Sequence, residues 1–319
     1  MVSAQPPSPA RLSRLAEELV ENGLPIDADT ERGALLLGEI DFALRPPVHE
    51  RQVFSVGTFV DPTTDPSGWS SGTGLDILRG PIGDLTLTEL RRFADGLSSW
   101  VMRHVDGRDE WVIFDRPTGS ERDLVVLAEV LGTTIVQRHP TGAVRIAGAF
   151  GVLRSEGLLW HHEPPVSRWV DELTASGNGD GSVLHALLEF AVHDLGSRGI
   201  GAILVYREAD VPGPGVEHRL PQPPPLDIRR PNGLAPLRHA LAQVDGAAVF
   251  DRTGTLRQLG SRLVPSAEAE RTVDGFRGMR HTSGRRYSWD DPLATVIVVS
   301  EDGPVSVFCK GELLGRSPE

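Results

Sequence analysis

The spacing of apolar residues predicts three helices in the first half of the chain. One lies between Ser8, a suitable N-cap, and Gly23, because the apolar residues there repeat at helical spacing. A second begins at the capping box that Thr86 forms with the glutamate three positions later, and its apolar face continues to Val101. The third covers about residues 120–131.

Short apolar runs between these helices predict strands. They are "GALLLGEIDFAL" (residues 33–44), "EWVIF", "TTIVQ", "AVRIAGAFGVL" and "GLLWHH", the last two forming a hairpin joined by "RSEG". Residues 46–83 are rich in Pro, Gly, Ser and Asp and receive no assignment.

The second half of the chain shows the same alternation. A helix capped by Ser182 leads to the strand "IGAILVY", and a Pro-rich loop over residues 211–236 precedes a short helix that ends near Ala242. The strand "GAAVFD", the turn "RTGT" and the returning strand "LRQLGSRLV" follow. The last piece, "ATVIVVSEDGPVSVFCKGEL", is predicted to be a strand, an acidic glycine turn and another strand.

Length and composition favour a folded protein of two α/β domains. A chain of 319 residues exceeds the usual single domain, and the Pro- and Gly-rich stretch 163–181 is a suitable junction. We therefore expect one domain over residues 1–165 and another over residues 166–319.

The charge and the cysteine content exclude several classes of function. The net charge is −12, of which −9 falls in the first domain (15 basic and 24 acidic residues) and −3 in the second (17 and 20), so binding to a nucleic-acid polymer is not expected. Cys309 is the only cysteine, which excludes an intrachain disulfide or a Cys-based zinc site. Neither a signal peptide nor a membrane-spanning run is recognisable, so a cytoplasmic protein without membrane contact is expected.

Polar residues at the ends of three apolar strands of the second domain are candidates for chemistry. Adjacent polar residues such as Arg280 and His281 are not expected in a buried strand, and glycines are not expected around them in a solvated helix. A glycine turn exposes backbone N–H groups, a guanidinium binds phosphate oxygens, and carboxylates suit hard divalent cations, so the set fits a nucleoside triphosphate. The three spots are Asp245 with Gly246, Arg280 with His281 after Gly278, and Ser300 with Glu301.

Residues from about 183 to 313 resemble the diadenylate cyclase domain, the nucleotide-binding domain of DNA-integrity scanning proteins and their membrane-anchored relatives. The resemblance is carried by "RGIGAILVY", the "DGA" that begins at Asp245, "GMRH" at 278–281 and "VVSEDGPVSVFCKGEL", in the family's order and near its spacings. It implies a mixed sheet flanked by helices. It also implies condensation of two ATP molecules into cyclic di-AMP with release of pyrophosphate, by two copies of the domain that face each other.

The resemblance also implies roles for individual residues. Asp245 would orient or deprotonate the attacking 3′-hydroxyl with the help of Mg²⁺ or Mn²⁺, and Arg280 and His281 would hold the triphosphate. Ser300 would contact phosphate, and Glu301 would contact the metal. The other substrate-binding positions that it implies are Gly201 and Ala202 at the adenine, and Gly246, Ala247, Gly278, Met279 and Thr282.

The sequence departs from the family pattern at two positions. The family usually reads "GTRHR", whereas Met279 replaces the Thr and Thr282 replaces the second Arg, which removes a hydroxyl and a charge; Arg285 or Arg286 could compensate. Two alternatives therefore stay open, namely a nucleotide-sensing module without turnover and a cyclase with another product. The first domain lies where some family members carry a predicted sensor domain, and we expect it to be regulatory on that ground.

The site residues also have simpler interpretations. Asp245 with Gly246 could be an ordinary turn before a strand, and Arg280 with His281 could be a surface loop pair. The segment from Ser300 to Gly303 would make a good hairpin turn without any further role.

Overall fold

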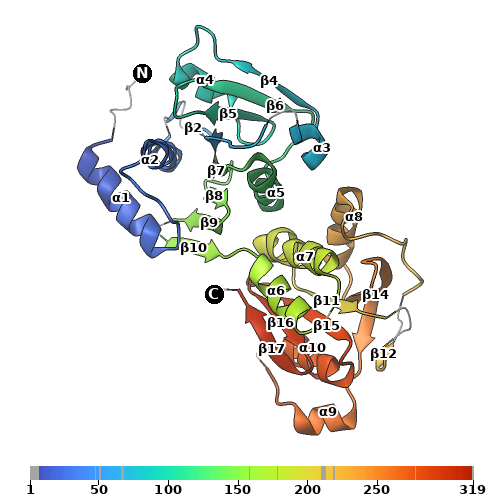
Figure 1. Ribbon diagram of the computed structural model, residues 1–319. Coiled ribbons are helices and arrows are strands. Elements are labelled where there is room, and N and C mark those ends of the chain that lie inside the picture. Colours follow the sequence, from blue (N-terminus) through green and yellow to red (C-terminus); the bar gives the residue numbers. More distant parts are fainter. Residues whose placement is uncertain are drawn as a thin grey trace. The chain divides into compact units, whose positions relative to one another are not determined.

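The computed structural model describes residues 7–46, 48–49, 52–65, 68–157, 159–177, 179–209, 213–217, 220–276 and 278–317. The chain divides into two compact units, Met1–Pro165 and Val166–Glu319 (Figure 1). In the described part of the chain, no helix is long and apolar enough to cross a membrane.

The N-terminal unit is built on a mixed sheet of eight strands in the order β10-β9-β8-β7-β3-β5-β6-β4. β3 and β5 run parallel, and the other neighbours pair antiparallel. Its strands are β3 (Val56–Val60), β4 (Ile77–Pro81), β5 (Ser99–Arg103), β6 (Glu110–Phe114), β7 (Thr134–Arg138), β8 (Val144–Gly148), β9 (Gly151–Glu156) and β10 (Leu159–Glu163), beside a separate pair β1 (Val48–His49) and β2 (Gln52–Val53).

Helices cover both faces of this sheet. One apolar cluster joins α1 (Pro9–Glu21) and α2 (Glu31–Leu44) to one face, and another joins α3 (Trp69–Thr73) and α5 (Glu121–Leu131) to the other. A smaller cluster holds α4 (Leu87–Phe93) against β5. Burial of these apolar faces is the main favourable contribution to the stability of the unit.

Three sequence-based assignments in the N-terminal unit are wrong. Residues 33–44, predicted as strands, belong to helix α2, because the Thr30 hydroxyl caps it by accepting a hydrogen bond from the Gly33 N–H. The helix after Thr86 ends at Phe93, because the Asp95 carboxylate accepts hydrogen bonds from the next backbone N–H groups and turns the chain into β5. The run "AVRIAGAFGVL" is not one strand but is divided between β8 and β9, whereas the predicted hairpin with "GLLWHH" is confirmed as β9 and β10.

The C-terminal unit contains a mixed sheet of seven strands in the order β12-β14-β13-β11-β15-β16-β17. β11 and β13 run parallel, whereas β15 is antiparallel to β11. Its strands are β11 (Ala202–Arg207), β12 (Val216–Glu217), β13 (Ala247–Phe250), β14 (Leu256–Leu263), β15 (Ala294–Val299), β16 (Val305–Cys309) and β17 (Glu312–Arg316).

Both faces of this sheet are also covered. The larger apolar cluster includes α6 (Ser167–Ala175), α7 (Gly181–Glu189), the π-helix η2 (Phe190–Leu195) and α8 (Pro231–Leu241). A second cluster lies on the other face, where Tyr287 of α10 (Met279–Asp290) packs against strand residues. The short elements η3 (Gly196–Arg198) and α9 (Ala267–Thr272) lie in connections.

Helix α10 contradicts the expectation that glycines around Arg280 and His281 exclude a helix. Gly278 is its N-cap with a φ of 103°, a conformation that favours glycine. Gly284 lies inside the helix, where an added Cβ would be 2.8 Å from the side chain of Val298. The glycines therefore start the helix and bring it close to β15.

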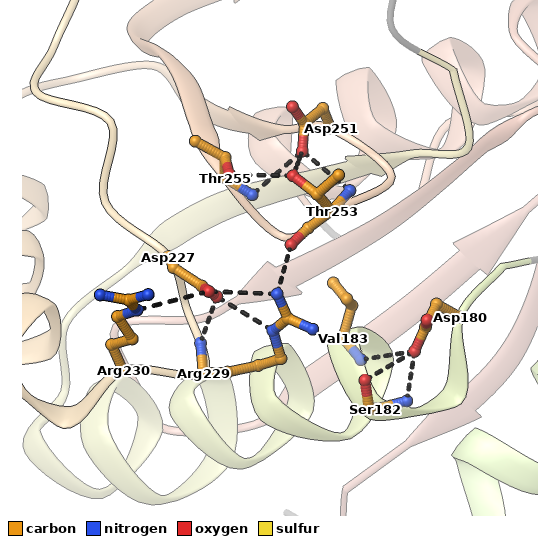
Figure 2. Close-up of polar contacts among 9 residues, drawn as sticks. All are labelled: Asp180, Ser182, Val183, Asp227, Arg229, Arg230, Asp251, Thr253 and Thr255. Atoms are coloured by element: carbon orange, nitrogen blue, oxygen red, sulfur yellow. Dashed lines mark hydrogen bonds and ion pairs between the residues drawn. The ribbon is translucent and has the colours of Figure 1, made fainter.

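Two other boundaries in this unit differ from expectation. The N-cap of α7 is Asp180 and not Ser182, because the Asp180 carboxylate accepts from the N–H groups of Ser182 and Val183 (Figure 2). Helix α8 begins at Pro231, inside the predicted loop 211–236, since proline fits the first turn of a helix.

A polar turn closes the hairpin between β13 and β14 at the end of β13 that follows Phe250. The Asp251 carboxylate accepts hydrogen bonds from the N–H groups of Thr253 and Thr255 and from the Arg257 guanidinium. The Arg229 guanidinium donates to Asp227 and to the Thr253 carbonyl (Figure 2). Burial alone would raise the pKa of Asp251, but the hydrogen bonds to its charged form outweigh burial and lower it. The turn closes the hairpin at the pair of Phe250 with Leu256.

Candidate functional site

The sheet topology brings three of the predicted polar spots to one edge. Ala202 pairs with Val299 on one side of β11, and Ile203 pairs with Ala247 on the other. The beginnings of β11 and β13 therefore lie beside the end of β15. This edge is the N-terminal end of the parallel pair, whereas ligands of open α/β sheets usually bind at the carboxyl end.

A cavity of about 750 Å³ opens at this edge, which is a size typical of small-ligand sites. The described lining residues include three arginines and two carboxylates, so the cavity favours an anionic ligand with an acidic group beside it. The charged lining residues are Arg262, Arg280, Arg286, Asp245 and Glu270, and the others are Ile203, Gly246, Gly260, Ser261, Leu263, Pro265, Gly278, Met279, His281, Thr282, Ser283, Val299 and Ser300.

The turn before β13 places Asp245 on the cavity wall. Gly246 has a φ of 116°, and a Cβ added there would lie 2.6 Å from the backbone carbonyl carbon of Gly260. Glycine is therefore required for the turn to pass so close to β14. The Asp245 side chain precedes the buried strand and is exposed.

Arg280 lies in the first turn of α10 and pairs with Glu301. Its Nη1 is 2.8 Å from the Glu301 carboxylate, with 41 % of the Arg280 side chain and 66 % of the Glu301 side chain exposed. Both side chains pass close to Gly201, where an added Cβ would be 2.6 Å from Arg280 Nη1. Arg280 therefore keeps an accessible surface while a carboxylate fixes its direction.

His281 and Thr282 are held by local contacts. The His281 ring is buried, with its centroid 5.8 Å from that of Phe276 and 6.3 Å from that of Phe308. The Thr282 hydroxyl accepts from the Phe276 N–H at 3.0 Å and donates to the Phe276 carbonyl at 2.8 Å. Both residues line the cavity, and both also fasten the loop before α10 to the helix.

Not every residue predicted from the sequence lines the cavity. The cavity lining includes eight of them: Asp245, Gly246, Gly278, Met279, Arg280, His281, Thr282 and Ser300. Ala202 and Ala247 are buried within strands, Gly201 lies under Arg280, and Glu301 contributes its ion pair. Of the two arginines considered as compensation for Thr282, Arg286 lines the cavity, whereas Arg285 donates to the Gly311 carbonyl.

Sequence reasoning missed Arg262 and Glu270. A regular hairpin closed by Phe250 and Leu256 would place Leu259 opposite Ala247, but two irregularities shift the pairing to Ser261. In the regular register Arg262 would lie opposite Val244, and the shift places it level with Gly246, next to Asp245. The sequence predicted the hairpin but not its bulges.

The residues of the cavity fit a divalent cation only in a site that the phosphates of a bound nucleotide complete. Among the described residues, no three His, Cys, Asp or Glu side chains stand close enough together to hold a metal ion. Mg²⁺ and Mn²⁺ sites are often completed by one or two carboxylates and the phosphates of a nucleotide. Asp245 can supply such a carboxylate, whereas Glu301 is paired with Arg280.

Two family models match the chain, one in each unit. Residues 13–163 match the model described as "Probable sensor domain DACNK", and residues 189–313 match "DisA bacterial checkpoint controller nucleotide-binding". The C-terminal unit is thus a nucleotide-binding domain of mixed α/β fold. It belongs to the diadenylate cyclase family, as the motifs predicted, and it follows a DACNK sensor domain.

Two solved structures resemble part of the chain. A hypothetical membrane spanning protein from Bacillus cereus is 17 % identical, with 48 % of this chain and 78 % of that chain covered and a TM-score of 0.34. A double mutant of DacA from Staphylococcus aureus is 21 % identical, with 43 % and 87 % covered and a TM-score of 0.26. Because both TM-scores are below 0.5, the family assignment depends on the family models. No curated protein matches the chain.

Proposed function

We propose that the C-terminal domain condenses two ATP molecules into cyclic di-AMP and releases two pyrophosphates. One observation carries the proposal: in a domain of the diadenylate cyclase family, Asp245 and Arg280 line the same cavity although they are far apart in the sequence. A guanidinium suits phosphate oxygens, and a carboxylate can accept a proton. The cavity thus combines the two groups that the reaction needs.

In each of two equivalent steps, the 3′-hydroxyl oxygen of one ATP forms a bond to the α-phosphorus of the other. The bond from that phosphorus to the oxygen bridging it to the β-phosphorus breaks, and pyrophosphate leaves with the electron pair. Asp245 accepts the hydroxyl proton, and Arg280 stabilises the charge that develops on the leaving group. Since each domain holds one ATP, two copies must face each other during the reaction.

The remaining residues position these two. Glu301 orients Arg280 through their ion pair, and His281 anchors the first turn of α10 through Phe276 and Phe308. A bound Mg²⁺ or Mn²⁺ would lower the pKa of the hydroxyl and neutralise phosphate charge, with Asp245 as its protein ligand. The N-terminal domain would regulate turnover, which its membership of a sensor-domain family supports.

The test is to incubate the purified protein with ATP and Mn²⁺ and to measure cyclic di-AMP and pyrophosphate. We expect Asp245→Asn to abolish product while ATP binding is largely kept, because the carboxylate acts in proton transfer. The matched control is Asp171→Asn on the exposed surface of α6, which removes the same charge away from the cavity. Undiminished turnover by Asp245→Asn would remove Asp245 from the mechanism.

Arg280→Ala tests the phosphate role separately. It should weaken ATP binding, because the guanidinium is assigned to the triphosphate, and an unchanged dissociation constant would contradict that assignment.

A nucleotide-sensing module without turnover is the second candidate. It is favoured by Thr282, which lacks the charge of the family's second arginine and whose hydroxyl bonds the loop instead. ATP binding by the wild type without product would decide for this candidate.

A further inference from the structure

Arg262 is the arginine of the cavity that the local structure engages least. Arg280 is held by Glu301 at 2.8 Å, and Arg286 donates from Nε to the Val273 carbonyl and from Nη2 to the Glu270 carbonyl. The ion pair of Arg262 with Glu217 spans 3.9 Å, and both side chains are 59 % exposed. A pair of this length and exposure contributes little, so the Arg262 guanidinium can turn to a ligand at low cost.

The position of Arg262 complements that of Arg280. In the sheet order β14-β13-β11-β15, Arg262 is on β14, Asp245 precedes β13, and Arg280 lies against Gly201 and Glu301 at β11 and β15. The pairing of Ser261 with Ala247 puts Arg262 directly beside the turn that carries Asp245. The two guanidiniums therefore come from opposite flanks of the carboxylate.

We propose that Arg262 binds the triphosphate of the nucleotide and supplies the positive charge that Thr282 does not provide. This inference rests on the proposed function insofar as the ligand is a nucleoside triphosphate. A polyphosphate chain offers oxygens along its length, so cations on both sides of Asp245 can bind it at once. With a second guanidinium on strand β14, the first turn of α10 does not need one at position 282.

The test compares the affinity of the full chain for 3′-deoxy-ATP and for AMP. The first keeps the triphosphate but lacks the attacking hydroxyl, so binding is measured without turnover. We expect Arg262→Ala to weaken 3′-deoxy-ATP binding about tenfold, the lower end for loss of a charged hydrogen bond because the cavity is open to solvent. AMP affinity should not change.

Two further variants make the result specific. Arg230→Ala is the matched control, because Arg230 is also exposed and also lies 3.9 Å from a carboxylate, that of Asp227, but outside the cavity. It should bind both nucleotides as the wild type does. Arg262→Lys keeps the charge and should recover part of the triphosphate affinity, and it replaces the alanine variant should that one fail to fold.

The inference is overturned if Arg262→Ala binds 3′-deoxy-ATP as tightly as the wild type, or if it loses affinity for both nucleotides equally. It is also overturned if the wild type binds no triphosphate. Its failure is distinguishable from failure of the proposed function. If the wild type binds 3′-deoxy-ATP but forms no cyclic di-AMP from ATP, the proposed cyclase activity is refuted. The role of Arg262 is then still decided by the affinities of the wild type and the Arg262→Ala variant for 3′-deoxy-ATP and AMP.

Discussion

Thr282→Val should destabilise the C-terminal domain by about 2 kcal/mol. Valine has nearly the same shape as threonine but lacks the hydroxyl that bonds both the N–H and the carbonyl of Phe276. Each such hydrogen bond contributes on the order of 1 kcal/mol net, and valine leaves both part-buried backbone groups unpaired. Thr282→Ser keeps the hydroxyl and should lower the stability of the domain by clearly less.

Hydrogen exchange of the β15 amides measures this loss in the full chain, because this buried interior strand exchanges only when the domain opens. A decrease of about 2 kcal/mol corresponds to exchange roughly 30-fold faster. Thr282→Arg, which restores the residue usual in the family, also removes the hydroxyl and should be destabilised to a similar extent. The reasoning is refuted if the valine variant exchanges as slowly as the wild type, or if the serine variant exchanges as fast as the valine variant.

Two further predictions concern stability. Gly246→Ala should cost on the order of 3 kcal/mol, because it puts a Cβ at a φ of 116° and 2.6 Å from the Gly260 carbonyl carbon. Gly275→Ala, where the nearest atom is 3.6 Å away, is the control, and equal β15 exchange rates for the two variants would contradict the strain argument. The lowered pKa of Asp251 means that its contribution to stability is complete above about pH 4, the unfolded value, and is lost as the pH falls further through the folded value. The free energy of unfolding of the C-terminal domain, followed by β15 exchange, should therefore decrease at acid pH, and less steeply in Asp251→Asn; parallel pH profiles for the two proteins would contradict this.

Local signals in the sequence were sufficient to predict those helices and strands whose boundaries depend on residues within or next to the element. Helix α1 begins at Pro9, α4 has the capping box of Thr86, and α5 begins after Ser120, as their patterns predicted. The strands at β6, β7, β11 and β13 were also predicted, because short apolar runs bounded by turn residues distinguish buried strands. The failure at residues 33–44 has a local cause as well. In an apolar run of this kind, the spacing of apolar residues does not distinguish a helix from a strand. Only the hydrogen bond of Thr30 identifies the start of a helix.

The candidate site was less accessible to sequence reasoning, because it depends on pairing between distant segments. The family motifs indicated Asp245, Arg280 and Ser300, and the pairing of β11 with β13 and β15 explains why they lie at one edge. The motifs gave no information on side-chain partners. The ion pair that directs Arg280 toward Glu301 and the bulges that set the register of Arg262 beside Gly246 follow from tertiary structure.

The sheet of the C-terminal domain has apolar clusters on both faces, and members of both clusters, among them Ile203 and Val299, also line the cavity. Met279, of which 88 % is exposed, belongs to neither cluster. A substitution at Met279 is therefore expected to cost little stability, whereas substitutions at Gly246 and Thr282, which also line the cavity, should destabilise the domain. An exposed residue of this kind on the cavity wall can then change while the sheet and its two apolar clusters are kept.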